Sequence, residues 1–80
     1  MKIPRDLNSD DLIKLLKPYG YETTRQAGSH IRLTTEKMGQ HHVTVPHHNP
    51  IKIGTLAAIL GEVANHLNIT KQSFLKEIFG

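Results

Sequence analysis

The spacing of hydrophobic and polar residues first predicts a helix near the start of the chain. Leu12, Leu15 and Leu16 recur at helical spacing, and Asn8 or Ser9 can cap the helix ahead of two aspartates. Acidic residues are favourable in a first helical turn. A proline at position 18 and a glycine at position 20 interrupt the pattern. The sequence therefore predicts a helix over about residues 9–18.

Three segments in the middle of the chain have the composition of strands. Residues 21–26 are rich in threonine and tyrosine, residues 29–35 alternate regularly between polar and apolar positions, and residues 41–45 form the third segment. Ala27-Gly28 separates the first two, and a turn on Gly39 separates the last two. Connections this short predict a three-stranded antiparallel sheet.

The last third of the chain predicts two helices. Residues 46–53 contain two prolines and are expected to form an extended connection. Apolar residues recur at helical spacing from Thr55 onward, with Gly61 inside the helix to permit close packing, and Thr70 caps a last helix. The order α-β-β-β-α-α predicts an α+β fold in which helices cover one face of the sheet and the other face is open.

The alternation of the strands predicts the chemistry of the open face. The apolar positions of residues 29–35 have to face the core, so His30, Arg32 and Thr34 point to the other side. By the same argument, His42 and Thr44 of the third strand share that face. The surface thus offers imidazoles, a guanidinium group and hydroxyls, but it lacks the aromatic residues that single-strand readers stack on bases.

Composition narrows the class of protein. The 80 residues are expected to form a single domain over residues 1–80, and the net charge of +3 with six histidines favours a polyanionic partner, nucleic acid first. Because there is no cysteine, disulfides, thiolate zinc sites and cysteine nucleophiles are excluded. No apolar stretch is long enough to be a signal peptide or a membrane span, so we expect a cytoplasmic protein without membrane contact.

Two histidine pairs, His41-His42 and His47-His48, raise the question of a metal site. Adjacent residues of a strand point to opposite faces, so the first pair cannot easily share an ion. No carboxylate lies near either pair in the sequence, and neither pair has a common zinc spacing. We therefore expect no metal and no cofactor.

Short motifs from Arg5 to about Phe79 carry a family resemblance. They are Gly20-Tyr21, Arg25, Gly28-Ser29-His30, Val43-Thr44-Val45-Pro46 and Lys52-x-Gly54-Thr55-Leu56. In this order and spacing the chain resembles the HicA family of toxins from prokaryotic toxin–antitoxin pairs. The resemblance implies a fold similar to a double-stranded-RNA-binding domain, metal-independent cleavage of RNA, chiefly mRNA, and a HicB-type antitoxin that binds and masks the toxin.

The resemblance also implies that His30, in the Gly-Ser-His motif, is the catalytic histidine. As a general base, His30 could take the proton from a ribose 2′-OH, or as an acid it could protonate the leaving 5′-oxygen. Arg32 would hold the scissile phosphate, and Ser29 is a further candidate beside it. Many family members carry a second basic or histidine residue directly after the catalytic histidine, where this chain has Ile31. His42 is a second acid–base candidate if the strand register places it opposite His30.

Other residues are candidates for contacts with the RNA backbone. Lys52 and Thr55 lie at the predicted start of a helix, where free amide groups attract phosphate, although Thr55 could simply cap the helix. Arg25, Lys37 and Lys2 could add to the electrostatic attraction or be ordinary surface charges.

Two other functions stay open alongside the ribonuclease. The first is a non-catalytic RNA-binding module of the same fold, because one fold hosts many functions. The second is a protein-interaction domain that binds an acidic partner and makes no RNA contact. An imidazole on the open face, directly after a tight Gly-Ser turn, favours the enzyme over a pure binding module.

Overall fold

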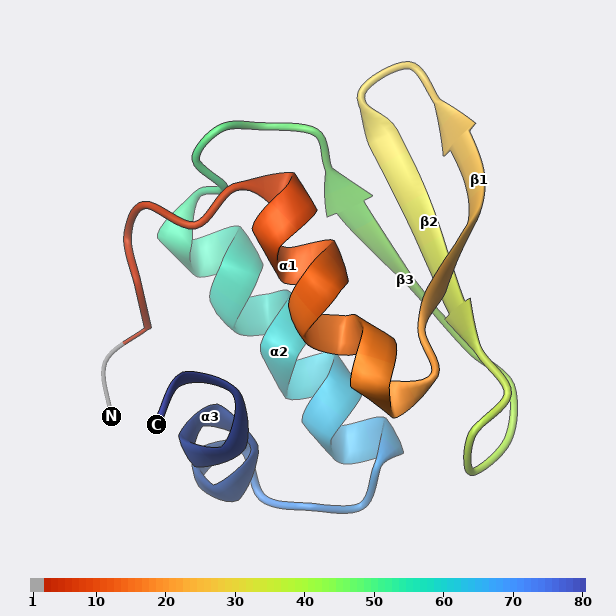
Figure 1. Ribbon diagram of the computed structural model, residues 1–80, viewed down its shortest axis with the longest axis vertical. Coiled ribbons are helices and arrows are strands. Elements are labelled where there is room, and N and C mark those ends of the chain that lie inside the picture. Colours follow the sequence, from red (N-terminus) through yellow and green to blue (C-terminus); the bar gives the residue numbers. More distant parts are fainter. Residues whose placement is uncertain (1–2) are drawn as a thin grey trace.

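The computed structural model describes residues 3–80, and its elements follow the predicted order (Figure 1). The chain forms α1 (Ser9–Leu16), the short 3-10 helix η1 (Lys17–Tyr19), β1 (Glu22–Ala27), β2 (His30–Thr35), β3 (His41–Pro46), α2 (Ile53–His66) and α3 (Lys71–Phe79). The predicted α+β class and the α-β-β-β-α-α order are confirmed. Each strand lies within one residue of its predicted bounds.

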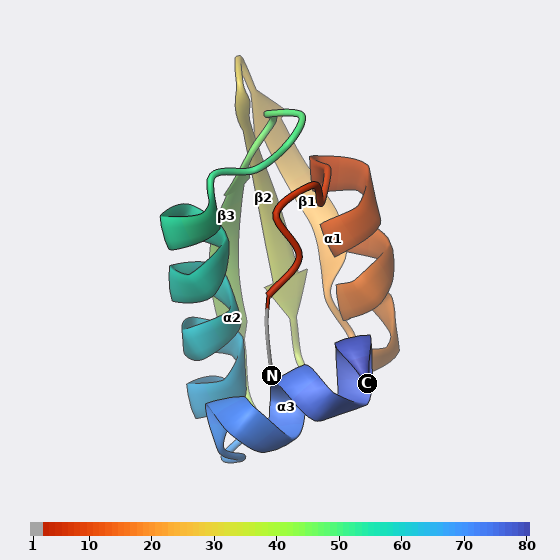
Figure 2. The same ribbon diagram turned by 90° about the vertical axis from the view of Figure 1, so that its left-hand side faces the viewer.

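The strands form one antiparallel sheet in the order β1-β2-β3. Helices α1 and α2 both lie over one face of the sheet, and α3 packs across the end of α2 (Figure 2). Within residues 3–80, no helix covers the opposite face, as predicted. No helix in this part of the chain is long and apolar enough to cross a membrane.

The core lies between the helices and the covered face of the sheet. Ile31 and Leu33 of β2 and Val43 and Val45 of β3 are buried, while the residues that alternate with them are mostly exposed. This alternation confirms which side chains reach the open face. Strand β1, at the edge of the sheet, is exposed along its whole length, and the tip of its hairpin with β2 projects beyond the helices (Figure 1).

The first helix ends earlier than predicted and leads into a tight turn. Its α-helical part stops at Leu16, because Pro18 has no N–H to continue the hydrogen-bonding pattern, and a 3-10 turn follows. Gly20 then adopts a φ of 87°, a conformation that glycine reaches without steric cost. A Cβ atom at this position would lie 2.6 Å from Oγ1 of Thr35, so the turn into β1 requires glycine.

The start of α2 differs from the prediction. The helix begins at Ile53, after Lys52 in an extended conformation, so Thr55 lies inside the first turn and is not the cap. The interpretation of Gly61 as a close-packing residue is also wrong, because a Cβ atom there would meet nothing within 4 Å. The predicted cap of α3 is confirmed: Oγ1 of Thr70 accepts a hydrogen bond of 3.1 Å from the Ser73 backbone N–H.

A candidate active site on the open face of the sheet

A tight turn and two strand partners fix the backbone of His30. Gly28 has a φ of 58° in the turn between β1 and β2, and His30 is the first residue of the central strand. The Ser29 carbonyl accepts a hydrogen bond of 2.7 Å from the His47 backbone N–H, which joins the turn to the chain after β3. His30 pairs with Ala27 on one side and Pro46 on the other. Its exposed side chain thus extends from a backbone held on both sides.

A cavity of about 160 Å³ lies beside His30 on the open face. Its walls are Arg25, Ala27, His30, Arg32 and Thr44. The strand register explains this set, because Arg32 pairs with Arg25 of β1 and with Thr44 of β3. Three of the residues proposed from the sequence, His30, Arg32 and Arg25, are therefore brought together around one cavity.

The two arginines give the cavity its electrostatic character. Arg25 and Arg32 are directly opposite each other on neighbouring strands, an arrangement in which like charges destabilise a sheet. In the described part of the chain, no acidic side chain lines the cavity to neutralise them. An anion bound between the guanidinium groups would offset this repulsion through charge-assisted hydrogen bonds. The geometry suits a phosphate group next to an imidazole.

The register separates His42 from His30. His42 pairs with Thr34, and His30 pairs with Pro46 at the other end of the strands. Positions 30 and 34 are about 13 Å apart along β2. His42 is therefore not opposite His30 and is too far along the strands to assist it at the same phosphate. Instead, Nδ1 of His42 lies 2.7 Å from Oγ1 of Thr34.

The remaining candidates lie outside the cavity beside His30. Ser29 is in the hairpin turn, and Lys52 and Thr55 are exposed at the start of α2, in the helical layer (Figure 1). Lys37 follows β2, and its Nζ donates a hydrogen bond of 3.4 Å to the Pro18 carbonyl. Lys2 lies outside the described residues.

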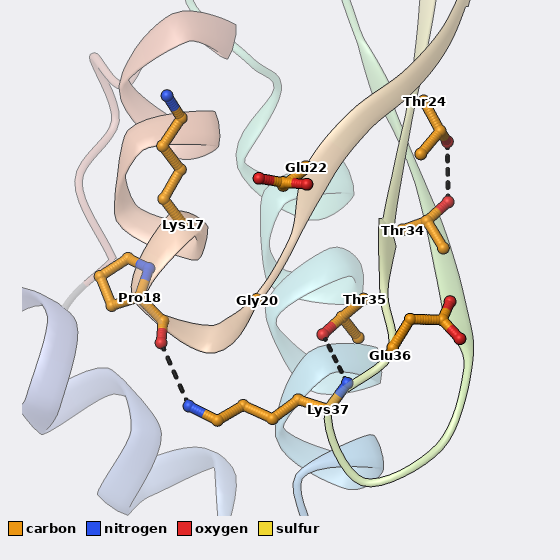
Figure 3. Close-up of a pocket in the computed structure, with 9 residues that line it drawn as sticks. All are labelled: Lys17, Pro18, Gly20, Glu22, Thr24, Thr34, Thr35, Glu36 and Lys37. Carbon is orange, nitrogen blue, oxygen red and sulfur yellow. Dashed lines mark hydrogen bonds between the residues drawn. The ribbon is translucent and has the colours of Figure 1, made fainter.

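A second, larger cavity of about 440 Å³ lies where η1 approaches the ends of β1 and β2 (Figure 3). Lys37 and Lys17 line it together with two carboxylates, Glu22 and Glu36. Its charges are balanced, in contrast to the cationic cavity beside His30.

Sequence reasoning missed two features of these sites. It placed Thr44 on the open face but gave it no role, and it did not pair Arg25 with Arg32. The place of Thr44 follows from the pairing of β2 with β3, and the arginine pair follows from the pairing of β1 with β2, whose register shifts at an irregularity between Thr23 and Arg25. No residue type at that position signals the shift, so the sequence offered no means to find it.

The structure thus defines an α+β protein whose open sheet face carries a cationic cavity. A family model described as the HicA toxin of bacterial toxin-antitoxin matches residues 9–65, which include all three strands and the whole cavity. The chain belongs to this HicA toxin family. No curated protein and no solved structure matched the chain.

Proposed function

We propose that this HicA family toxin is an endoribonuclease that cleaves mRNA without a metal ion, and that His30 transfers the proton. The observation that carries the proposal is the cavity in which the imidazole of His30 lies beside two arginines. RNA brings its own nucleophile in the ribose 2′-OH, so an imidazole and a cationic phosphate site are sufficient for the reaction.

The proposed reaction is an internal transesterification. His30 accepts the 2′-OH proton as the 2′-oxygen forms a bond to phosphorus, and the bond from phosphorus to the 5′-oxygen breaks. The proton then passes to the 5′-oxygen, so that the histidine returns to its starting state. Arg25 and Arg32 stabilise the negative charge that develops on the phosphate oxygens.

The proposed partner is a HicB-type antitoxin. The exposed imidazole and guanidinium groups lie on the uncovered face of the sheet, where a protein could mask all three together. An antitoxin that offers acidic side chains to Arg25 and Arg32 would occupy the place of the RNA phosphate. Binding of the antitoxin and binding of RNA would then be mutually exclusive.

The test is cleavage of RNA in EDTA by the wild type, by His30→Ala and by the control His48→Ala, with folding checked by circular dichroism. His48 is also exposed and does not line the cavity. We expect His30→Ala to lose about 10²–10⁴-fold in rate and His48→Ala to retain full activity.

Equal activity of the wild type and a folded His30→Ala would exclude His30 as the proton-transfer group. If neither cleaves RNA but both bind it, the protein is instead a binding module of the same fold.

A further inference from the structure

Three side chains form a hydrogen-bonded row across the open face, separate from the cavity beside His30. Oγ1 of Thr24 lies 2.7 Å from Oγ1 of Thr34, which lies 2.7 Å from Nδ1 of His42. The row crosses all three strands, from β1 through β2 to β3. Nothing in the proposed chemistry of His30 uses it.

The row orients the imidazole of His42. Nδ1 is occupied by the Thr34 hydroxyl, so Nε2, on the other side of the ring, is directed away from Thr34. Because His42 is exposed, Nε2 is free to form a hydrogen bond with a ligand on the open face.

The row and the cavity beside His30 lie on one continuous polar surface. Arg32 and its partner Thr44, which line the cavity, lie on β2 and β3 between His30 and the row. His30 and Thr34 are about 13 Å apart along β2, which exceeds the reach of a single phosphate group. Thr24 and Thr34 also line the 440 Å³ cavity, where Figure 3 shows their hydroxyls facing each other. An extended chain that crosses the open face would therefore meet both places.

We propose that Thr24, Thr34 and His42 form a second subsite for the RNA chain. There Nε2 of His42 forms a hydrogen bond with an oxygen of the sugar–phosphate backbone, more than one nucleotide from the bond that His30 cleaves. This inference rests on the proposed ribonuclease function. The subsite binds through hydrogen bonds more than through net charge, because the lysines and glutamates of the adjoining cavity balance each other.

Substrate length provides the test. A dinucleotide reaches only the cavity beside His30, whereas a longer oligonucleotide also reaches the row. Kinetics of both substrates are measured for the wild type, Thr34→Val and His42→Ala. Thr23→Val is the matched control, because Thr23 is exposed on β1 but pairs with the core residue Leu33 and so belongs to the other face.

We expect Thr34→Val and His42→Ala to raise KM for the longer RNA about three- to tenfold, because each loses one hydrogen bond to the substrate. The value of kcat should not change. Both variants should cleave the dinucleotide like the wild type, and Thr23→Val should match the wild type on both substrates. An equal rise in KM for both substrates would show that the row has only a structural role. An unchanged KM for both substrates would show that RNA does not contact the row. Either result overturns the subsite.

Failure of the ribonuclease itself gives a different result. If the wild type cleaves neither substrate, the proposed function fails. Binding of the same two RNAs, measured by fluorescence anisotropy, then tests the subsite independently of cleavage. Weaker binding of only the longer RNA by Thr34→Val would then support the subsite. Unchanged binding would overturn it.

Discussion

At the scale of single residues, the opposed pair of Arg25 and Arg32 is the clearest conflict between stability and function. Opposite charges or apolar pairs across neighbouring strands stabilise a sheet, and like charges destabilise it. The exposed pair here has the unfavourable arrangement, beside the histidine with which the two arginines share a cavity. Such a local conflict is expected where a site has to bind an anion.

The pair can be tested by removing one charge. We expect Arg25→Gln to raise the free energy of unfolding by up to about 0.5 kcal/mol, because it relieves the repulsion, and to lower the rate of RNA cleavage. Urea denaturation and cleavage assays on the same preparations measure the two effects. Arg5→Gln, at an exposed position outside the cavity, is the control and should change neither. A loss of stability in Arg25→Gln would contradict the proposed repulsion.

The sequence predicted which side chains of β2 and β3 reach the open face, but not which side chains lie next to them. The alternation of β2 was sufficient to assign His30 and Arg32 to the open face, because a strand with one apolar side can face the core in only one way. The distance from His30 to His42 depended on the pairing of β2 with β3. This pairing is a long-range property that local patterns do not encode.

At the scale of the elements, the strands were predicted more accurately than the start of α2. Period-two alternation marks the residues of β2 and β3, and composition marks β1, whereas a helix start depends on one residue in an extended conformation, here Lys52. Lys52 makes no side-chain cap, so the usual sequence signal for a helix start is missing. Thr55 is a residue type that often caps helices, but it lies three positions after the actual N-cap, Lys52.

Glycine in α2 offers a prediction at the same scale. The interior glycine Gly61 has open space where a Cβ atom would be, so Gly61→Ala should stabilise the protein by about 0.5–1 kcal/mol by reducing the entropy of the unfolded chain. Thermal unfolding should show a rise of a few degrees in Tm. The contrasting variant is Gly20→Ala, which combines a positive φ with a contact of 2.6 Å and should lower Tm. A fall in Tm for Gly61→Ala would reveal a packing role that the structure does not contain.

At the scale of the whole molecule, a histidine pair joins the sheet to the helical layer. Nε2 of His66, in α2, donates hydrogen bonds to the carbonyls of Lys37 and Gly39 in the loop after β2, at 2.9 and 3.0 Å. The ring of His66 stacks on that of His41 with 4.4 Å between centroids. Nδ1 of His41 in turn lies 2.8 Å from the hydroxyl of the buried Tyr21. One cluster thus links the turn before β1, the strand β3, the loop after β2 and the helix α2.

This cluster predicts how the fold responds to acid. Burial, and then the neighbouring charge of His66, lower the pKa of His41 below its ordinary value of 6.5, and the opposing effect of Glu62 is smaller. Between the folded and unfolded pKa values, the unfolded chain binds more protons than the folded one. The stability from His41 is therefore fully present above pH 6.5 and is lost as pH falls below this value toward the pKa of the folded state.

Urea denaturation across this pH range measures the effect. In the wild type, the free energy of unfolding should fall between pH 7.5 and pH 5, because the pKa of His41 is lower in the folded state than in the unfolded chain. In His41→Gln, the free energy of unfolding should fall less steeply over the same range. Glutamine retains a side-chain acceptor for the Tyr21 hydroxyl but does not titrate. The same substitution at the exposed His48 is the control and should leave the wild-type slope unchanged. Equal slopes for the wild type and His41→Gln would show that acid acts on the fold through other groups.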